Sequence, residues 1–174
     1  ELTSSWEAVI TAFKGMTITG NFSYNLYTDP SFYREAPSTY SLYPGVEEPV
    51  PRFITDRLSE SQQFNQVLVT NVFAEYTKSF ARTHNFKLMA GYNQEHHRAK
   101  RIGAARFNLT SQDLNDLDLA TGDMTTSGGS SAFALKGAFY RVNYDYKGKY
   151  LLETSGRYDG SSRFPKNDRW GFFP

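Results

Sequence analysis

Residues 140–164, YRVNYDYKGKYLLETSGRYDGSSRF, carry the pattern that decides the fold. Apolar and polar side chains alternate on either side of the run Lys147-Gly148-Lys149, where Gly148 permits a tight turn. Side chains on a β-strand point to opposite faces in turn, so the stretch predicts a β-hairpin with its exit loop. One predicted face carries Tyr140, Val142, Tyr144, Tyr146, Tyr150, Leu152, Thr154 and Tyr158, and the other carries Arg141, Asn143, Asp145, Glu153, Ser155 and Arg157.

Alternation of this kind fits two architectures that differ in where the apolar face lies. A soluble β-sandwich buries its apolar face and exposes its polar face to water. A transmembrane β-barrel turns its apolar face to lipid and encloses water in its lumen. The hairpin alone leaves both open.

Composition removes several other classes. The chain contains no Cys, which excludes a disulfide framework and a thiol nucleophile. No apolar run approaches the roughly 20 residues of a spanning helix, so a helical membrane protein is excluded. The net charge of +1 indicates no nucleic-acid surface. The 12 Tyr and 14 Phe suit sites where an apolar ring carries a polar tip, as at a membrane interface.

The rest of the chain predicts strands joined by connections that are short and long in turn. Strands are expected over 5–13, 16–27, 61–78 and from 84 to about 100, followed by the hairpin strands. Short connections fall at 14–15, 79–83 and 147–149, and long irregular loops at about 28–60, 101–131 and 159–168. Five prolines interrupt the first long loop. Outer-membrane barrels show this asymmetry, with short periplasmic turns and long outer loops, whereas a sandwich has no reason to.

Residues 139–174 resemble the barrel of SusC/RagA-type TonB-dependent outer-membrane transporters. The resemblance is carried by RVNY at 141–144, YLL at 150–152, RYDGSSRF at 157–164 and NDRWGFFP at 167–174. Residues 14–18 and 21–25 resemble an earlier hairpin of that family more loosely.

That resemblance implies an all-β fold: about six to seven strands of an antiparallel, up-and-down transmembrane β-barrel of about twenty-two strands. It implies a TonB-driven importer of oligosaccharides or oligopeptides in the outer membrane of a Gram-negative, Bacteroidota-like bacterium. A SusD-like surface lipoprotein, outer-membrane lipid and TonB would be its partners. The plug, the TonB-contacting segment and the remaining strands would lie outside this chain, which we expect to be a piece of a longer polypeptide. No enzymatic activity or cofactor is implied.

Site residues follow from the two predicted faces. Arg141, Asn143, Asp145, Glu153 and Arg157 are expected to face the lumen in cross-strand polar pairs that are structural. An aromatic girdle at the membrane interface is expected from Tyr76, Tyr144, Tyr146 and Tyr150, close to the short turns. The signature loop, defined as Asp159, Gly160, Ser161, Ser162, Arg163 and Phe164, is expected to be architectural, with Arg163 and Phe164 as weak candidates for cargo binding.

Other chemistry is sparse. His96 and His97 point to opposite faces of a strand and cannot readily share a metal, so all three histidines are interpreted as exposed strand-end residues. The aspartates of 113–123 lack calcium-loop spacing, and 111–117 predicts a capped helical turn. Residues 128–131, GGSS, resemble flexible linker.

Two alternative functions remain at this point. The first is a soluble carbohydrate-binding β-sandwich. The second is an all-β glycoside hydrolase, which requires two carboxylates roughly 5 to 9.5 Å apart. Glu153 is a weak candidate for one of them and has no evident partner.

Overall fold

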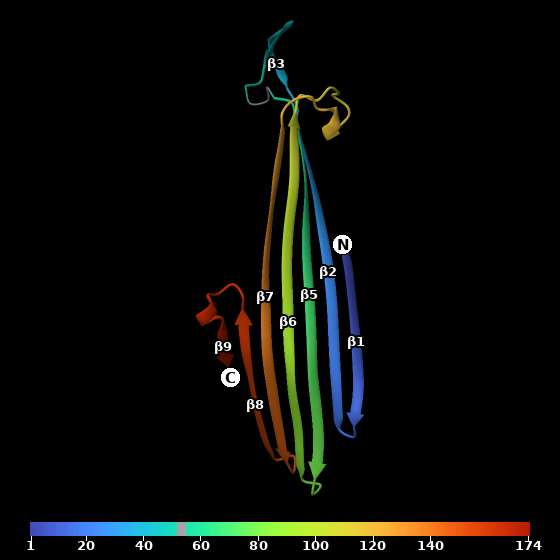
Figure 1. Cartoon of the computed structure of the whole chain (residues 1–174), viewed down its shortest axis with the longest axis vertical. Helices are drawn as coiled ribbons and strands as arrows, with labels where there is room; N and C mark the ends of the chain where they lie inside the picture. The colour runs from blue at the N-terminus through green and yellow to red at the C-terminus, as the bar shows by residue number, and fades with distance from the viewer. Residues whose placement is uncertain (52–54) are drawn as a thin grey trace. The chain divides into compact units, whose positions relative to one another are not determined.

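A computed structural model describes residues 1–51 and 55–174 of the chain. Within them, seven strands form one sheet in the order β1-β2-β5-β6-β7-β8-β9, so chain neighbours are also sheet neighbours once the β3-β4 hairpin is set aside (Figure 1). The sheet strands are β1 (Leu2–Phe13), β2 (Met16–Glu35), β5 (Arg57–Phe80), β6 (His84–Phe107), β7 (Met124–Tyr146), β8 (Tyr150–Ser161) and β9 (Trp170–Phe173). The predicted antiparallel, up-and-down arrangement is confirmed.

The chain divides into two compact units. The first comprises residues 1–27, 65–98 and 132–174, and the second comprises residues 28–64 and 99–131. Four of the long strands contribute residues to both units.

In the first unit, the predicted short turns lie next to one another at one end of the sheet (Figure 1). The amide of Thr77 donates to the carbonyl of Gly15 at 2.7 Å. The amide of Lys147 donates to the carbonyl of Thr83 at 2.8 Å. Gly15 and Gly148 have positive φ angles of 91° and 66°, which explains glycine at both turns. The turn chemistry in the sequence therefore predicted these three connections correctly.

Strand register in the first unit matches the predicted faces. Across β7 and β8, Tyr144 pairs with Leu152 and Asn143 pairs with Glu153. We call the face that carries Asn143 and Glu153 the polar face and the face that carries Tyr144 and Leu152 the apolar face. The β1–β2 register shifts between Thr11 and Phe13, and the ring of Phe13 lies 5.9 Å from that of Tyr76.

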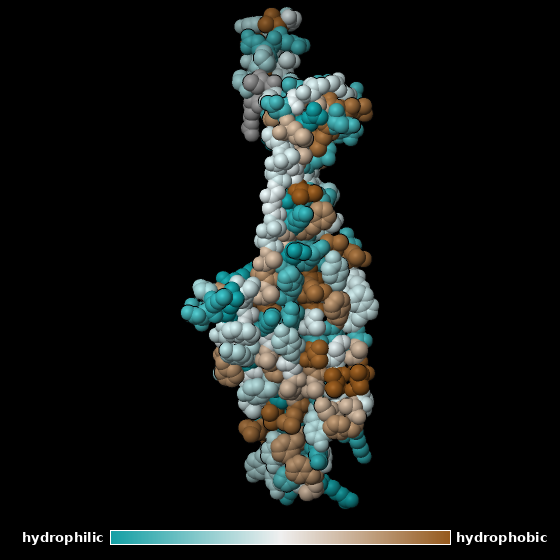
Figure 2. Space-filling view, in the orientation of Figure 1, coloured by the Kyte–Doolittle hydropathy of each residue, from teal (hydrophilic) through white to brown (hydrophobic). Residues whose placement is uncertain are grey.

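No second layer covers the apolar face within the described residues. Leu152 is 65% exposed, Leu88 39% and Phe22 38%. Figure 2 shows apolar residues gathered at the surface over the part of the sheet near the short turns. A soluble sandwich would seal these side chains in a core, so the sandwich alternative is wrong. None of the described helices is both long enough and apolar enough to cross a membrane.

The second unit corrects the expectation of an irregular segment over 28–60. β2 continues through Pro30 to Glu35, and β5 already begins at Arg57. The pairs between β1 and β2 run up to Leu2 and Leu26, and Pro30 lies outside that paired segment. Between β2 and β5 in the chain, β3 (Thr39–Tyr43) and β4 (Val46–Pro49) form a separate hairpin.

The loop expected over 101–131 is also shorter than predicted. β6 reaches Phe107 and β7 begins at Met124, so residues 128–131 lie in a strand and the linker interpretation is wrong. Ser111 does accept hydrogen bonds from the amides of Asp113 and Leu114, but the short 3₁₀ helix lies later, at Leu117–Leu119. The capped helical turn predicted over 111–117 is therefore wrong, although Ser111 makes the hydrogen bonds that such a cap would make. The exit loop over 159–168 is shorter too, since β8 runs to Ser161 and a second 3₁₀ helix spans Lys166–Asp168.

The second unit has a small core of its own. Leu58, Leu109 and Ala120 are buried together, with Leu117 packed against them. Beside this core the guanidinium of Arg34 pairs with Asp56 at 2.9 Å, and the two side chains are only 11% and 9% exposed. Arg34 also donates to the carbonyl of Ser111 and to the side chain of Asn115. This arginine thus connects the end of β2 to the 108–123 loop.

Candidate functional site

The polar face near the β7–β8 turn is joined by side-chain hydrogen bonds. Asn143 donates to Glu153 across the two strands, and Arg141 lies 3.8 Å from the same carboxylate. Asp145 accepts from Asn85 of β6 at 3.2 Å and from the turn amide of Gly148 at 2.7 Å. Alternation brings these groups together on one face, and the turn is anchored by one of them. Exposed pairs of this kind contribute little to stability, about 0 to 1 kcal/mol each.

Arg157 pairs differently from the expectation. Its guanidinium makes two 3.1 Å contacts with Asp159, two residues along the same strand, and lies 5.7 Å from the ring centroid of Phe139 on β7, so its polar partner is not across the strands. The Asp159 carboxylate lies over Gly137, its register partner on β7, where a Cβ atom would collide with it. A glycine on β7 therefore makes the space for the fork-shaped Arg157–Asp159 pair.

The remainder of the signature loop is held mainly by backbone contacts. The amide of Ser162 donates to the carbonyl of Ala134 at 2.9 Å, and its hydroxyl accepts from the Ala134 amide at 2.8 Å. Ser161 Oγ accepts from the amide of Arg163 at 3.3 Å. Arg169 donates to the carbonyl of Phe164 at 2.9 Å, which closes the loop from its far side. These contacts support an architectural role for the loop.

Gly160 has a separate role, on the apolar face. The indole of Trp170 covers it, and a Cβ atom at position 160 would lie 2.7 Å from two ring carbons. The same indole stacks on Tyr158, with ring centroids 5.1 Å apart and planes 9° from parallel. The neighbours Asp159 and Gly160 thus serve opposite faces: the first makes an ion pair and the second admits an aromatic ring.

Arg163 and His97 meet on the polar side of β7. The guanidinium carbon of Arg163 lies 3.6 Å from the ring centroid of Phe133, and His97 stacks on that ring at 4.3 Å. Glu95 contacts His97 at 3.2 Å. His84 and His97 are therefore half-buried, contrary to the prediction, and only His96 of the three is exposed, as predicted.

An open cleft of about 420 Å³ lies along this part of the first unit. Its lining includes Glu95, Arg157 and Asp159 of the polar face together with Phe164 and Phe173. Phe164 is 57% exposed, so its ring is available to a ligand, whereas the guanidinium of Arg163 is already stacked.

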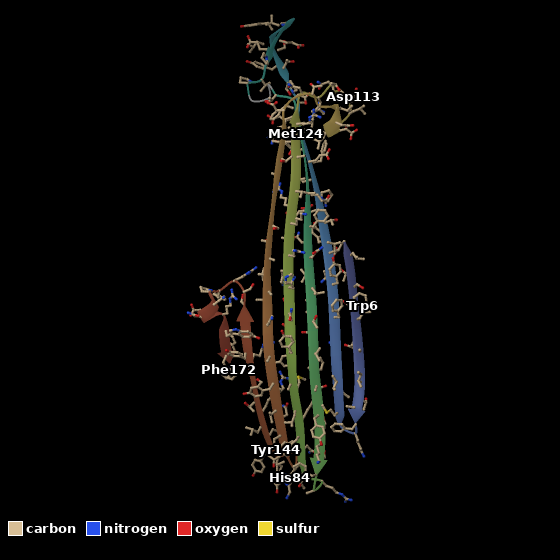
Figure 3. The ribbon with its side chains drawn as sticks, viewed as in Figure 1. Trp6, His84, Asp113, Met124, Tyr144 and Phe172 are labelled. Carbon is tan, nitrogen blue, oxygen red and sulfur yellow. The ribbon has the colours of Figure 1, made fainter. Side chains whose placement is uncertain are left out.

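The aromatic residues at the short turns form a connected cluster. Figure 3 shows Tyr144 and His84 together at that end of the sheet, where their side chains are hydrogen-bonded at 2.8 Å. The ring of Phe86 lies 4.6 Å from that of Tyr144, and the ring of Tyr146 lies 4.9 Å from that of His84. Tyr150 continues the cluster from Tyr146 at 6.3 Å. The cluster includes Tyr144, Tyr146 and Tyr150 of the predicted girdle.

Catalytic and metal chemistry find little support. Among residues 1–51 and 55–174, no group of three or more His, Asp or Glu side chains is arranged to hold a metal ion. Glu153, the weak hydrolase candidate, is occupied by Asn143 and Arg141.

Sequence reasoning missed two features of these sites. The Arg34–Asp56 pair joins residues 22 positions apart in a segment interpreted as irregular. The glycines at 137 and 160 were not identified as spaces for Asp159 and Trp170. An isolated glycine inside a strand pattern is the signal that could have marked Gly137, since it often indicates a close approach.

Comparison with known proteins gives consistent likenesses. The chain is 33% identical over 111 residues to TonB-dependent receptor P3 of Formosa agariphila, covering 60% of this chain and 11% of that protein. It is 31% identical over 117 residues to TonB-dependent receptor SusC of Bacteroides thetaiotaomicron, covering 64% and 11%. The chain thus spans about a tenth of the length of the curated relatives it matches. No family model matches it.

Solved structures show the same fold. The structure of the RagAB peptide transporter superposes on 98% of this chain, and on 18% of its own, with a TM-score of 0.84 and 21% identity. The RagAB peptide importer in its open-open state gives a TM-score of 0.82 at 23% identity. The open sheet described above is therefore the fold of part of a barrel wall.

Proposed function

Because the chain is one of the SusC/RagA-like TonB-dependent receptors, which are outer-membrane proteins and not enzymes, we propose that the protein carrying it is an energy-coupled nutrient importer. This chain supplies strands of the barrel wall and parts of its outer loops. The plug and the segment that contacts TonB lie elsewhere in the protein.

The observation that carries the proposal is the opposite polarity of the two faces of one uncovered sheet. Leu152 is 65% exposed on the apolar face, while the adjacent Glu153 is hydrogen-bonded to Asn143 on the polar face. An apolar face without a covering layer is stable against lipid, and a ladder of polar pairs is stable against water. We therefore assign Arg141, Asn143, Asp145, Glu153 and Arg157 to the wall of a water-filled lumen.

The relatives support a proposal for the cargo and the partner. The RagAB structures are those of a peptide transporter, which supports oligopeptides as cargo, and oligosaccharides are the second cargo class that we propose, from the resemblance to the SusC/RagA family. A SusD-like surface lipoprotein would cover the outer opening and deliver cargo, and TonB would drive its release inward. Phe164 is the signature-loop side chain best placed to contact cargo, because its ring is exposed in the cleft beside Arg157.

Deleting the gene and measuring uptake tests this function. Cells would receive, separately, a fluorescently labelled mixture of oligosaccharides and a labelled peptide digest. We expect the deletion to abolish uptake of one mixture and to spare the other, and the intact gene on a plasmid to restore it. Unchanged uptake of both mixtures, or recovery of the protein from the soluble fraction, would contradict the proposal.

A further inference from the structure

We propose that His96, Arg98 and Lys136 form a binding site on the apolar face for the phosphate groups of an anionic lipid headgroup in the outer leaflet. This inference rests on the proposed function, because it takes the apolar face to be the lipid-facing side of the barrel. We call these three residues the basic patch. All three side chains are exposed.

Their position along the strands places them at the edge of the apolar band. Along the apolar face of β6 the side chains are first apolar or aromatic, at Leu88, Ala90 and Tyr92. They then become polar, at Gln94, His96 and Arg98. The hydroxyl of Tyr92 donates to Gln94 at 3.0 Å, so its polar tip points toward the patch side. Tyr rings with this orientation mark the boundary between hydrocarbon and headgroups.

Register brings Lys136 beside the β6 residues. His97 stacks on Phe133, and Asn85 is hydrogen-bonded to Asp145, so β6 and β7 keep one antiparallel register between these contacts. That register sets Lys136 opposite Gln94 and diagonal to His96, at about 7–8 Å. On its other side Lys136 pairs with Gly160, which is covered by the Trp170 indole. A second interfacial aromatic residue thus borders the patch.

The patch has no internal counter-charge. No ion pair joins His96, Arg98 or Lys136 to any residue that the structure describes. The Asn93–Asn71 contact fixes the register of β5 against β6, which places Gln66 and Leu68 beside the patch. The His97–Phe133 contact does the same for β7, which places Ala132 and Ala134 there. None of these neighbours is acidic.

Because Arg98 and Lys136 have no acidic partner among the described residues, an anion from outside the chain can pair with both. A cation is unfavourable against hydrocarbon, and the penalty falls toward the interface, where headgroups are found. Within the first unit the patch lies away from the short turns, which are periplasmic in such barrels, so we place it in the outer leaflet. Arg98 can bind phosphate with two parallel hydrogen bonds, and Lys136 acts as a second point charge. A phosphorylated glycolipid of the outer leaflet matches this chemistry.

The test compares lipid binding by three forms of the full-length protein purified in detergent. The patch variant combines His96→Gln, Arg98→Gln and Lys136→Gln. The control variant combines Arg82→Gln and Lys149→Gln, which remove the same two permanent charges at the short turns. Lipid A is titrated into each form, and native mass spectrometry counts the bound molecules. Unchanged heat-modifiable migration on gels verifies that each variant is folded.

We expect the patch variant to bind lipid A about 25-fold more weakly, at about fivefold for each permanent charge, and the control variant to bind as the unaltered protein does. Equal affinity in the patch variant would overturn the inference, as would an equal loss in the control. Displacement of lipid A by millimolar inorganic phosphate would overturn the lipid source, because it would indicate a site for free phosphate. If the deletion abolishes cargo uptake as proposed but the patch variant binds lipid A as the unaltered protein does, only this inference is wrong and the proposed function stands.

Discussion

Substituting Gly160 with alanine tests whether the signature loop is built around the Trp170 indole. A Cβ atom at position 160 would lie 2.7 Å from two indole carbons and 2.8 Å from a third. Carbon atoms normally approach to about 3.5–4.0 Å, so the indole must shift by about 1 Å. Because Trp170 also stacks on Tyr158, that shift disturbs the contact between the two rings.

The magnitude follows from two opposing effects. Inserting a methyl group into a filled space destabilises the folded state by about 1–3 kcal/mol, through strain or through loss of ring stacking. Replacing a glycine inside a strand returns about 0.5–1 kcal/mol, because the unfolded chain loses less entropy on folding. We therefore expect Gly160→Ala to lower the free energy of unfolding by about 1–2 kcal/mol.

The assay is urea unfolding of the full-length protein in lipid vesicles, followed by tryptophan fluorescence. Gly20→Ala is the matched control, because no heavy atom lies within 4 Å of the added Cβ and stability should stay unchanged or rise slightly. In a Trp170→Ala background, Gly160→Ala should lose its cost, since the colliding ring is absent. If Gly160→Ala and Gly20→Ala unfold at the same urea concentration, the assigned packing of Trp170 is refuted.

Three further outcomes are expected. Tyr144→Phe removes the 2.8 Å hydrogen bond to His84 and should lower the free energy of unfolding by about 0.5–1.5 kcal/mol in the same urea titration. Arg34→Met leaves the buried Asp56 carboxylate unpaired, at a cost on the order of 3 kcal/mol, so limited proteolysis of intact cells should cut the 108–123 loop faster; an unchanged cleavage rate would count against the Arg34 contacts. Arg141→Gln breaks only an exposed 3.8 Å pair with Glu153 and should change the free energy of unfolding by less than about 1 kcal/mol; a larger loss would show that the pair is not freely hydrated.

The strands could be predicted where side-chain polarity alternates, and their ends could not. Tyr144 and Leu152 pair as the pattern indicated, because each apolar side chain must choose one face and a one-residue slip would reverse all of them. Pro30 and Gly128, by contrast, were interpreted as breaks in strands, although both lie within strands. At these positions the strand is maintained by backbone pairing with the neighbouring strand. Its side chains therefore need not alternate in polarity, and the sequence shows no strand pattern there.

Sites that depend on contacts distant in sequence were the least predictable. The polar face could be predicted because its members alternate along two adjacent strands. Arg157 bonds within its own strand because Gly137, twenty positions earlier, leaves room for the Asp159 carboxylate. The pairing of Arg34, near the end of β2, with Asp56, just before β5, likewise depends on a contact distant in sequence, and no periodic signal marks either residue.

The most direct measurement concerns the neighbouring positions 152 and 153. Because the chain contains no Cys, single cysteines can be introduced there, with any cysteines elsewhere in the protein replaced, and spin-labelled in the protein reconstituted in lipid vesicles. Collision with oxygen, which dissolves in lipid, is then compared with collision with a water-soluble nickel complex. We predict that the label at 152 is relaxed mainly by oxygen and the label at 153 mainly by nickel. Equal access of the nickel complex to both labels, or the reverse preference, would contradict the assignment of the two faces to lipid and lumen.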